Sequence, residues 1–440
     1  MLRSTFANNG MVVAPHHLAA ETGRDVLRDG GNAIEAVVAA AATIAVVYPH
    51  MNSIGGDGFW LIRPPNQTPL GIDACGASAK LATSKYYKSK GYKKIPTRGP
   101  DAALTMAGTV SGWQSALSLS EKHGGRLPLK RLLNDAILYA KKGMAVTEGQ
   151  KRNTDEKYNE LIKIPGFGDH FLVEGRQPEV GEVFKQEKLA ATIEYLSDAG
   201  LDDFYKGDIA RKISNYVQSE GGWLTEKDLA NHSSDWDDPI CTDYRDVTVW
   251  ECPPNGSGIA ALMAMNIAEG FDIPSMGPQS ADRYHYLIES LKLGYADALQ
   301  YVADPRVSDV PIKGLLSKSY ATGRRENISL DQAITDVSYG KPVPNADTVY
   351  LTVADKHGNA CSFINSLYSG FGTGLVVPET GIALQNRGSL FSLDPSHPNF
   401  LRGNKRPYQT IIPAMATRND EMWLSFGVMG GFQQPQGHLQ

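Results

Sequence analysis

The sequence predicts an α+β protein in which helices cover β-sheets, and not an array of βαβ units. Three observations support this fold class. Strands and helices are mixed near the N-terminus, helical spacing of apolar residues dominates the middle of the chain, and alternating strand patterns follow residue 347. Separate runs of helices and strands are typical of folds in which helices pack on the faces of sheets.

The N-terminal part predicts two helices and three strands. Asn32 suits the N-cap of the second helix, because its side chain can accept a hydrogen bond from a free backbone N–H group. Gly30 and Gly31, just before it, suit the end of the first helix. A tight glycine-rich loop at 55–58 precedes the last two strands. In chain order the predicted elements are Met11–Ala14, Thr22–Arg28, Ala33–Val47, Phe59–Ile62 and Leu70–Asp73.

The middle of the chain is predicted to be mostly helical. Asp243–Cys252 predicts a strand, and a loop at 253–258 then leads into a helix that ends at Glu269. Ala281–Val302 predicts a longer helix. Before these elements, apolar residues recur at helical spacing in four segments, which are Gly112–Lys122, Leu129–Lys141, Gln186–Ala199 and Ile209–Ser219.

The composition of the chain changes near residue 335. Residues 336–346 are polar and rich in turn formers, which predicts an exposed linker. Strands follow, and the turns at 356–359 and 418–420 each join two of them. The predicted strands are Thr348–Ala354, Ala360–Leu367, Ile382–Asn386, Thr410–Thr417 and Met422–Val428.

Composition and charge exclude several classes of protein. The chain is 42% hydrophobic and 21% charged, which is typical of a globular protein with a large core and argues against disorder. The 43 basic and 48 acidic side chains give a net charge of −5. Because no basic excess is available to neutralise phosphates, we expect no nucleic-acid partner.

The cysteines and the apolar segments indicate the compartment. None of the four cysteines forms a C-x-x-C pair, so we expect small buried thiols in a reducing compartment and neither a disulfide framework nor a zinc ribbon. The N-terminus lacks the apolar core of a signal peptide. The longest uncharged apolar run, Ala36–Val47, has 12 residues, where a membrane span needs about 20. We therefore expect a soluble cytoplasmic protein without membrane association; a secreted protein whose leader was removed is the alternative.

Familiar ligand-binding motifs do not fit the sequence. Gly370, Gly372 and Gly374 are spaced like a dinucleotide-binding loop, but residues 375–378 do not begin a helix, so a glycine turn is expected. The ten histidines show no metal-ligand spacing. The sequence also has no nucleophile elbow and no Walker A motif. We therefore expect no metal and no cofactor.

Thr348 opens a strand directly after the polar linker that ends at Asp347. A threonine hydroxyl needs a neighbouring base, and cleavage of the bond before Thr348 would supply its own α-amine as that base. Such an amine has an intrinsic pKa of about 7.7–8, and burial lowers it, so it can accept a proton near neutral pH. Gly430 and Gly431 could direct backbone N–H groups at a developing oxyanion. From spacing alone, β-propensity and a simple glycine turn are the simpler explanations.

Several ordered sequence blocks resemble the γ-glutamyltranspeptidase family of N-terminal nucleophile hydrolases, over about Met11 to Gln440. The densest block is DTVYLTVADKHGNACSFINSLYSGFGTGLVVPETGIALQNRG, followed by NKRPYQTIIP and FGVMGG; GGNAIEAVVAAAATIAVVYPHMNSIGGDGFWLI and ECPPNGSG lie upstream. The resemblance implies a four-layer αββα sandwich and a precursor that cleaves itself between Asp347 and Thr348. Residues 1–347 would form the large-subunit portion of one αββα domain, and residues 348–440 the small-subunit portion.

The resemblance also implies roles for particular residues. Thr348 takes the place of the nucleophile, which attacks an amide and carries the acyl group until water or an amine releases it. Ser366 takes the place of the second hydroxyl residue, which supports the nucleophile. Gly430 and Gly431 match the glycines of the family's oxyanion site.

Departures from the family pattern concern the substrate. Gln409 and Thr410 lie where the family has two serines lining the site. Cys75 replaces the arginine that holds the γ-glutamyl α-carboxylate, and Leu390 replaces the acidic residue that holds the α-amine. Tyr368 replaces an asparagine near the nucleophile. Because cysteine and leucine cannot make the two charged contacts, we do not expect strict γ-glutamyl recognition.

The NRG, PYQT and GVMGG blocks resemble the acylase-like and oxamate-amidohydrolase-like branch of the family. Arg387 is then a candidate anchor for a substrate carboxylate, and a structural salt bridge is an equal alternative. The segment from Ser392 to Lys405 is shorter than the family's lid loop, which predicts a more open site. The small-subunit portion would have 93 residues, which is short for the family, so we expect a C-terminal portion to be missing.

Together these features predict an autoprocessing amidohydrolase or acylase that cleaves an amide bond through a threonine acyl-enzyme. Its partners would be a small amide or γ-glutamyl-like substrate and the two subunits cut from one precursor, with a homo-oligomer left open. A true γ-glutamyltranspeptidase or glutathione hydrolase is one alternative. A non-catalytic protein that binds small molecules and retains the fold is the other.

Overall fold

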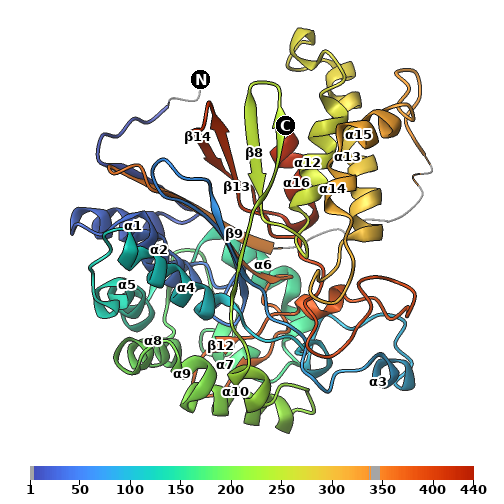
Figure 1. Ribbon diagram of the computed structural model, residues 1–440. Helices are drawn as coiled ribbons and strands as arrows, with labels where there is room; N and C mark the ends of the chain where they lie inside the picture. Colours follow the sequence, from blue (N-terminus) through green and yellow to red (C-terminus); the bar gives the residue numbers. More distant parts are fainter. Residues whose placement is uncertain (1–3, 336, 338–346) are drawn as a thin grey trace.

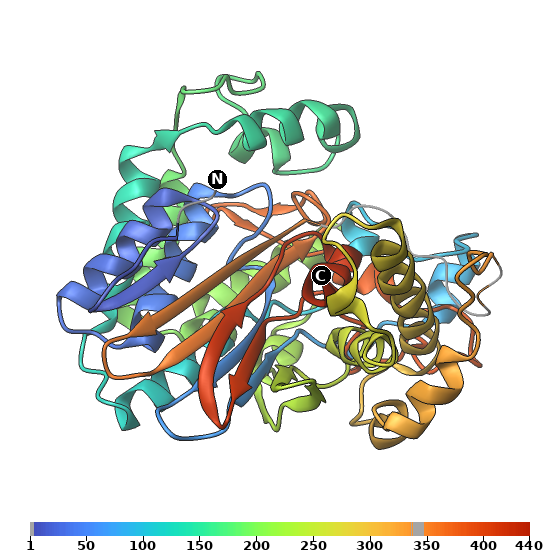
Figure 2. The ribbon, with the colours of Figure 1, turned by 90° about the horizontal axis from the view of Figure 1, so that it is seen from above.

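A computed structural model describes residues 4–335, 337 and 347–440 of the chain. Two antiparallel sheets occupy its centre, with one group of helices outside each sheet (Figures 1 and 2). Most helices of the first half of the chain lie on one side, and those that follow residue 257 lie on the other. The predicted linker at 336–346 lies outside the described residues, except for Val337.

The first sheet contains the N-terminal strands and the strand that begins at the predicted cleavage site. Its order is β1-β9-β10-β2-β3-β6, and all neighbouring strands are antiparallel. Every residue of β2 and β10 is buried, because helices cover one face of this sheet and the second sheet covers the other. The bounds are β1 Gly10–Val13, β2 Asp57–Arg63, β3 Leu70–Ala74, β6 Asp235–Asp237, β9 Asp347–Asp355 and β10 Ala360–Tyr368.

Helix α2, Ala33–Val47, lies against β9 and β10 and is buried along its whole length. Most of its side chains are alanine, valine or isoleucine, so the helix can be enclosed on all sides. The predicted N-cap is confirmed, because the Asn32 side chain accepts from the N–H group of Glu35 and the Glu35 carboxylate accepts from that of Asn32. Around α2 pack α1 His17–Arg28, α4 Thr109–Lys122 and α5 Leu129–Lys142.

Smaller helices complete the lower part of the molecule in the view of Figure 1, with Ser84–Ser89 apart at the lower right. Helix α6 was not predicted, because only four of its residues are buried and it has no apolar stripe. The others are close to their predicted positions or are short. The bounds are α3 Ser84–Ser89, α6 Glu148–Leu161, α7 Phe167–Phe171, α8 Glu187–Ala199, α9 Asp203–Lys206, α10 Asp208–Ser219 and α11 Glu226–Ala230.

The second sheet has the order β14-β13-β8-β7, and α12 packs against β7 and β8. The single strand predicted at Asp243–Cys252 is wrong: the chain turns at Arg245, which has φ of +60°, and forms a hairpin instead. The strands are β7 Ile240–Tyr244, β8 Val247–Glu251, β13 Ala414–Arg418 and β14 Glu421–Phe426. The helices are α12 Gly258–Ala268, α13 Ala281–Tyr301, α14 Ile312–Leu315, α15 Lys318–Arg325 and α16 Gln434–Leu439.

The two sheets share an apolar layer. Phe59, Leu61 and Ile364 of the first sheet form one buried cluster with Ile411 and Met415 of the second sheet and the segment before it. Burial of these side chains holds the sheets together, since removing apolar surface from water is favourable. Helices, sheet, sheet and helices therefore follow one another, as the αββα prediction requires.

Three further predictions need correction. The strand predicted at Ile382–Asn386 is only β12, Ile382–Ala383, which pairs with β11, Val376–Val377. The strand predicted from Thr410 begins at Ala414, because the preceding residues turn into the site described below. Cys241 is exposed on an outer strand, although the other three cysteines are buried as expected.

Candidate active site

Thr348 is the second residue of β9 and is 2% exposed. The antiparallel register of β9 and β10 shifts between Asn365 and Tyr368, opposite Thr348. Ser366 lies in that irregular stretch and is fully buried. The structure thus brings the predicted nucleophile and the predicted second hydroxyl residue onto neighbouring strands at one end of the first sheet.

Gln434, the first residue of α16, reaches the predicted nucleophile from the group of helices that follows residue 257. Its side-chain Nε2 donates to Thr348 Oγ1 at 3.4 Å, and its Oε1 accepts from the backbone N–H of Ile412 at 2.9 Å. The side chain is fully buried. Sequence reasoning missed Gln434. The resemblance gave roles to no residue after Gly430 and Gly431, and no local pattern distinguishes a glutamine three positions later.

Gly430 and Gly431 form the turn that leads into α16. Their φ angles are +124° and +55°, so the backbone there is in a region that glycine adopts at little cost. Within the described part of the chain, neither backbone N–H group has a hydrogen-bond partner. Both amides are therefore free to bind an oxygen, and Gln434 ties this turn to Thr348.

Arg387 is fully buried in a short 3-10 helix, η3, Arg387–Leu390. Its Nη1 donates to Thr410 Oγ1 at 2.7 Å, and its guanidinium carbon lies 4.6 Å from the ring centre of Tyr368. Its Nε and Nη2 have no hydrogen-bond partner among the residues that the structure describes. Burial lowers the pKa of Arg387, and the charge of Asp57 opposes that shift. The alternative of a structural salt bridge is not observed, because Nη1 bonds to Thr410 and no carboxylate among the described residues pairs with this guanidinium.

Tyr368 has an unusual backbone conformation for a residue with a side chain. Its φ is +81°, which costs on the order of 1–3 kcal/mol for a residue other than glycine. Its backbone N–H donates to Ser366 Oγ at 2.7 Å, and its ring faces the Arg387 guanidinium. The strained residue therefore links the region of the nucleophile to the arginine.

Asp57, the first residue of β2, is a buried carboxylate that the sequence analysis noted only as part of a glycine-rich loop. Its Oδ1 accepts from the Gly76 N–H group at 2.8 Å and from Gln385 Nε2 at 2.6 Å. Its Oδ2 accepts from Gln409 Nε2, also at 2.6 Å. Burial raises the pKa of Asp57 to about 6, against the opposing charge of Arg387 and these hydrogen bonds. The sequence signal that could have identified Asp57 is an acidic residue within a glycine-rich loop.

Neither of the two positions that depart from the family pattern carries a charged side chain. The Cys75 thiol lies 2.9 Å from Gln409 Nε2 and 3.4 Å from Asn255 Nδ2, and burial raises its pKa well above the usual value. Leu390 packs beside Tyr408 in the apolar cluster under α12 and α13. Neither position offers a charge to a γ-glutamyl group.

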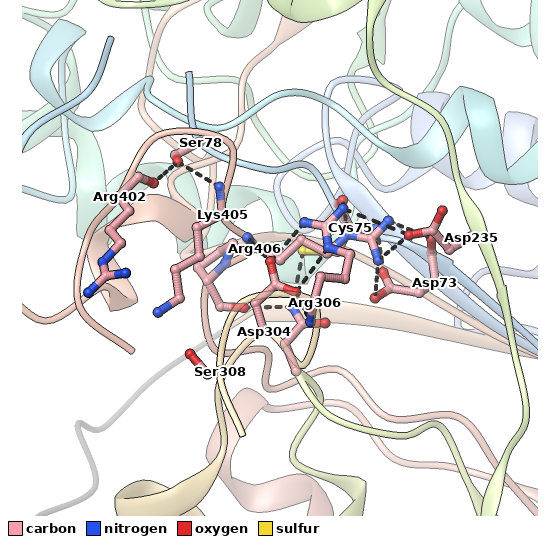
Figure 3. A network of polar contacts seen from close by, with 12 residues as sticks. Asp73, Cys75, Ser78, Asp235, Asp304, Arg306, Ser308, Arg402, Lys405 and Arg406 are labelled. Atoms are coloured by element: carbon pink, nitrogen blue, oxygen red, sulfur yellow. Dashed lines mark hydrogen bonds and ion pairs between the residues drawn. The ribbon is translucent and has the colours of Figure 1, made fainter. Parts of the chain in front are cut away.

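Arg406 lies beside Cys75 in a network of polar contacts (Figure 3). Its Nη1 lies 2.9 Å from both Asp73 Oδ2 and Asp235 Oδ2, and its Nε donates to the Cys75 carbonyl at 3.2 Å. Its backbone N–H donates to Asp304 Oδ2 at 2.8 Å. This buried network fixes the end of β3 against the segment that carries Gln409 and Thr410.

The described residues contain neither a candidate metal cluster nor a candidate membrane-spanning helix. Within residues 4–335, 337 and 347–440, no group of three His, Cys, Asp or Glu side chains is placed to hold a metal ion. No helix in the same ranges has the length and apolar character needed to cross a bilayer. The expected absence of a cofactor stays a prediction.

Sequence comparison identifies the family. The profile of γ-glutamyltranspeptidase matches residues 19–440. The chain is 43% identical to the oxamate amidohydrolase proenzyme of Klebsiella pneumoniae, over 99% of this chain and 81% of that protein. It is 38% identical to the glutathione hydrolase-like YwrD proenzyme of Bacillus subtilis, with the same coverage. The chain therefore belongs to the γ-glutamyltranspeptidase family.

Solved structures agree with this assignment. The cephalosporin acylase of Bacillus halodurans superposes with a TM-score of 0.92 at 41% identity, covering 100% of this chain and 81% of that one. The γ-glutamyltranspeptidase of Helicobacter pylori gives 0.71 at 28% identity, covering 76% and 95%. The predicted family, the α+β fold class and an enzyme of the amidohydrolase or acylase class are thereby confirmed. The site residues stay predictions.

Proposed function

We propose that the protein is an autoprocessing amidohydrolase for small amides that carry a carboxylate next to the scissile bond. The observation that carries this proposal is the free Nε–Nη2 edge of the buried Arg387. These two donors form the planar fork that binds a carboxylate through two parallel hydrogen bonds. Because a buried charge without a partner is costly, an anionic substrate would complete the site. The 43% identity to an oxamate amidohydrolase supports a short acid of this kind.

Maturation would begin with cleavage between Asp347 and Thr348. The Thr348 hydroxyl oxygen attacks the Asp347 carbonyl carbon, the C–N bond breaks, and the nitrogen takes up the hydroxyl proton. The resulting ester is hydrolysed by water, which leaves the Asp347 carboxylate and a free α-amine on Thr348. The burial of Thr348 on an end of β9 supports this step, as does the proenzyme status of the named relatives. Residues 1–347 and 348–440 would become the two portions.

Turnover would use the new amine as the general base. It accepts the Thr348 hydroxyl proton while the oxygen attacks the substrate carbonyl, and it returns that proton to the leaving nitrogen, which departs as an amine or ammonia. Water then hydrolyses the acyl-enzyme. The unpartnered N–H groups of Gly430 and Gly431 are suited to hold the oxyanion in both steps.

The other predicted residues would orient these groups. Ser366 fixes the strained Tyr368 backbone, whose ring faces Arg387. Thr410 holds the Nη1 side of the guanidinium, so that the opposite edge is left for substrate. Gln409 donates a hydrogen bond to Asp57 and so helps to orient this carboxylate. These contacts support a positioning role for Ser366 near the nucleophile, and for Tyr368, Gln409 and Thr410 around the substrate-binding arginine.

Intact-mass measurement and substrate comparison test this proposal. We expect the wild-type chain to yield a fragment ending at Asp347, and Thr348→Ala to stay in one piece. The cleaved enzyme should hydrolyse oxamate, whereas oxamide, its neutral analogue, and a γ-glutamyl anilide should react at least about a hundredfold more slowly in kcat/KM. Arg387→Met should remove the preference for oxamate. Equal rates on oxamate and oxamide, or faster γ-glutamyl turnover, would overturn the substrate assignment.

A further inference from the structure

We infer that Gln434 is a further catalytic residue, whose side-chain amide donates a hydrogen bond to the nucleophilic oxygen of Thr348. The inference rests on the proposed function, since it requires Thr348 to be the nucleophile. It adds a role that the resemblance did not supply for any residue after the glycine pair. The contact itself joins Gln434 Nε2 and Thr348 Oγ1 at 3.4 Å.

The direction of the Gln434 amide is determined by its other hydrogen bond. The backbone N–H of Ile412 can only donate, and it lies 2.9 Å from Gln434 Oε1. The oxygen end of the amide must therefore face Ile412, which leaves the NH2 end toward Thr348. Because both Gln434 and Thr348 are almost fully buried, water competes little for this contact.

A donor at this position suits both halves of the reaction. The hydroxyl oxygen has two lone pairs and one proton, so an N–H group on one lone pair favours release of the proton toward the α-amine. Negative charge that develops on the oxygen during attack is then stabilised by the same donor. When water hydrolyses the acyl-enzyme, the threonine oxygen departs, and the donor again meets developing charge.

The helix that carries Gln434 is anchored one turn later. His438 lies four residues after Gln434 on α16 and therefore on the same face. Its Nδ1 is 2.6 Å from Glu251 Oε1 on β8, and both side chains are fully buried. Helix α16 also packs against α12 and α13. We therefore assign His438 and Glu251 as positioning residues that hold Gln434 against the nucleophile.

Two substitutions of Gln434 separate its contact with the nucleophile from its hydrogen bond to the backbone of Ile412. Gln434→Glu keeps an oxygen that can accept from Ile412 N–H, but it loses the NH2 donor to Thr348. Gln434→Met has a similar volume and loses both bonds. The matched control is Gln436→Ala, at a partly exposed glutamine on the same helix without a side-chain hydrogen bond in the described residues.

The experiment measures precursor cleavage, and then kcat and KM for oxamate after processing. If Gln434 acts on the nucleophile, both variants cleave more slowly and lose at least about tenfold in kcat with an unchanged KM, whereas Gln436→Ala behaves like wild type. A folded Gln434→Glu protein with wild-type cleavage and kcat would overturn the inference. If thermal unfolding shows that the glutamate variant does not fold, a folded Gln434→Met protein is judged by the same criterion.

A Thr348→Ala control distinguishes the two levels of proposal. If Thr348→Ala is still cleaved and active, the proposed function fails. If Thr348→Ala is inactive while both Gln434 variants are fully active, only the role of Gln434 fails.

Discussion

The charge state of Asp57 depends on its burial in the candidate site. It is fully buried, and burial raises its pKa from 3.8 to about 6. Three side-chain or backbone N–H groups donate to it, so the carboxylate is well oriented but poorly solvated. Between pH 4 and 6 the folded protein therefore keeps a proton that the unfolded chain has already lost.

Stability should consequently fall as pH rises through the folded pKa of Asp57. Compared with a chain in which Asp57 stayed neutral, the free energy of unfolding is lower by about 3 kcal/mol above pH 7 and unchanged below about pH 4. Urea unfolding of wild type and Asp57→Asn at pH 4.5 and 7.5 measures it: the variant should gain stability relative to wild type at the higher pH. The exposed Asp238→Asn is the control and should show no such change. A pH-independent difference for Asp57→Asn would contradict this account.

Sequence reasoning identified part of the site at the level of single residues. Thr348 and Ser366 meet at the strand ends, and Arg387 contacts Tyr368 and Thr410, as a shared site requires. Resemblance supplied these positions. Asp57 and Gln434 were missed because their importance comes from contacts with residues far away in the sequence. Gln409 is 352 positions from Asp57 and Thr348 is 86 positions from Gln434, and no local pattern encodes such contacts.

Helix α2 shows how a single element supports the site. It lies under β9, the strand that carries Thr348, and its first turn is held by the Asn32 side chain. That side chain accepts from two N–H groups of the helix and donates to the carbonyls of Ser120 and His123. It therefore caps α2 and also ties it to the end of α4.

Asn32→Ala should lower the free energy of unfolding by about 2 kcal/mol, at the upper end of the range for N-caps, because buried partners are left unsatisfied. The matched comparison is Thr83→Ala, which removes the N-cap of the short surface helix α3 and should cost less than about 1 kcal/mol. Urea denaturation of both variants provides the values. Similar costs at the two caps would show that the buried contacts of Asn32 add nothing.

Elements were predictable where one periodicity ran uninterrupted. Helices α2, α5 and α13 agree with the sequence to within a residue or so. Helix α2 is an apolar run that follows the cap Asn32, α13 follows the cap Ser280, and α5 has a regular apolar spacing. The hairpin of β7 and β8 was missed because Arg245, a residue that rarely marks a turn, adopts positive φ there. Helix α6 was missed because its surface is polar on most sides.

At the scale of the whole molecule, Arg406 joins the two portions that cleavage would separate. It belongs to the small-subunit portion, whereas Asp73, Asp235 and Asp304 belong to the large one. The side chain is 4% exposed, so its ion pair with Asp73 is shielded from solvent. Removing one partner of such a pair leaves a buried charge unsatisfied.

Arg406→Met should therefore destabilise the protein by about 3–5 kcal/mol, with a lower thermal midpoint and earlier separation of the two portions after processing. Arg402→Met, on the exposed side of the same segment, is the control and should change the midpoint little. Differential scanning fluorimetry and size-exclusion chromatography record the two effects. An Arg406→Met protein as stable as Arg402→Met would refute this role.

The four layers could be predicted from the resemblance, but the sheet order could not. Strands β9 and β10 come late in the chain and insert between β1 and β2, an arrangement that only long-range pairing determines. The order also decides where the predicted nucleophile lies, since it places β9 between β10 and β1, with β1 paired to residues 352–355 of that strand.

That interior position has a consequence for maturation. A freshly made chain end is ordinarily the loosest part of a protein and frays within nanoseconds. Here the new end would emerge from a strand that pairs with β10 on both sides of the register shift at Thr348 and with β1 at its far half. Cleavage before Thr348 would therefore free its α-amine while the strand that carries this residue stays paired. The reactive amine would be held in place as soon as it forms.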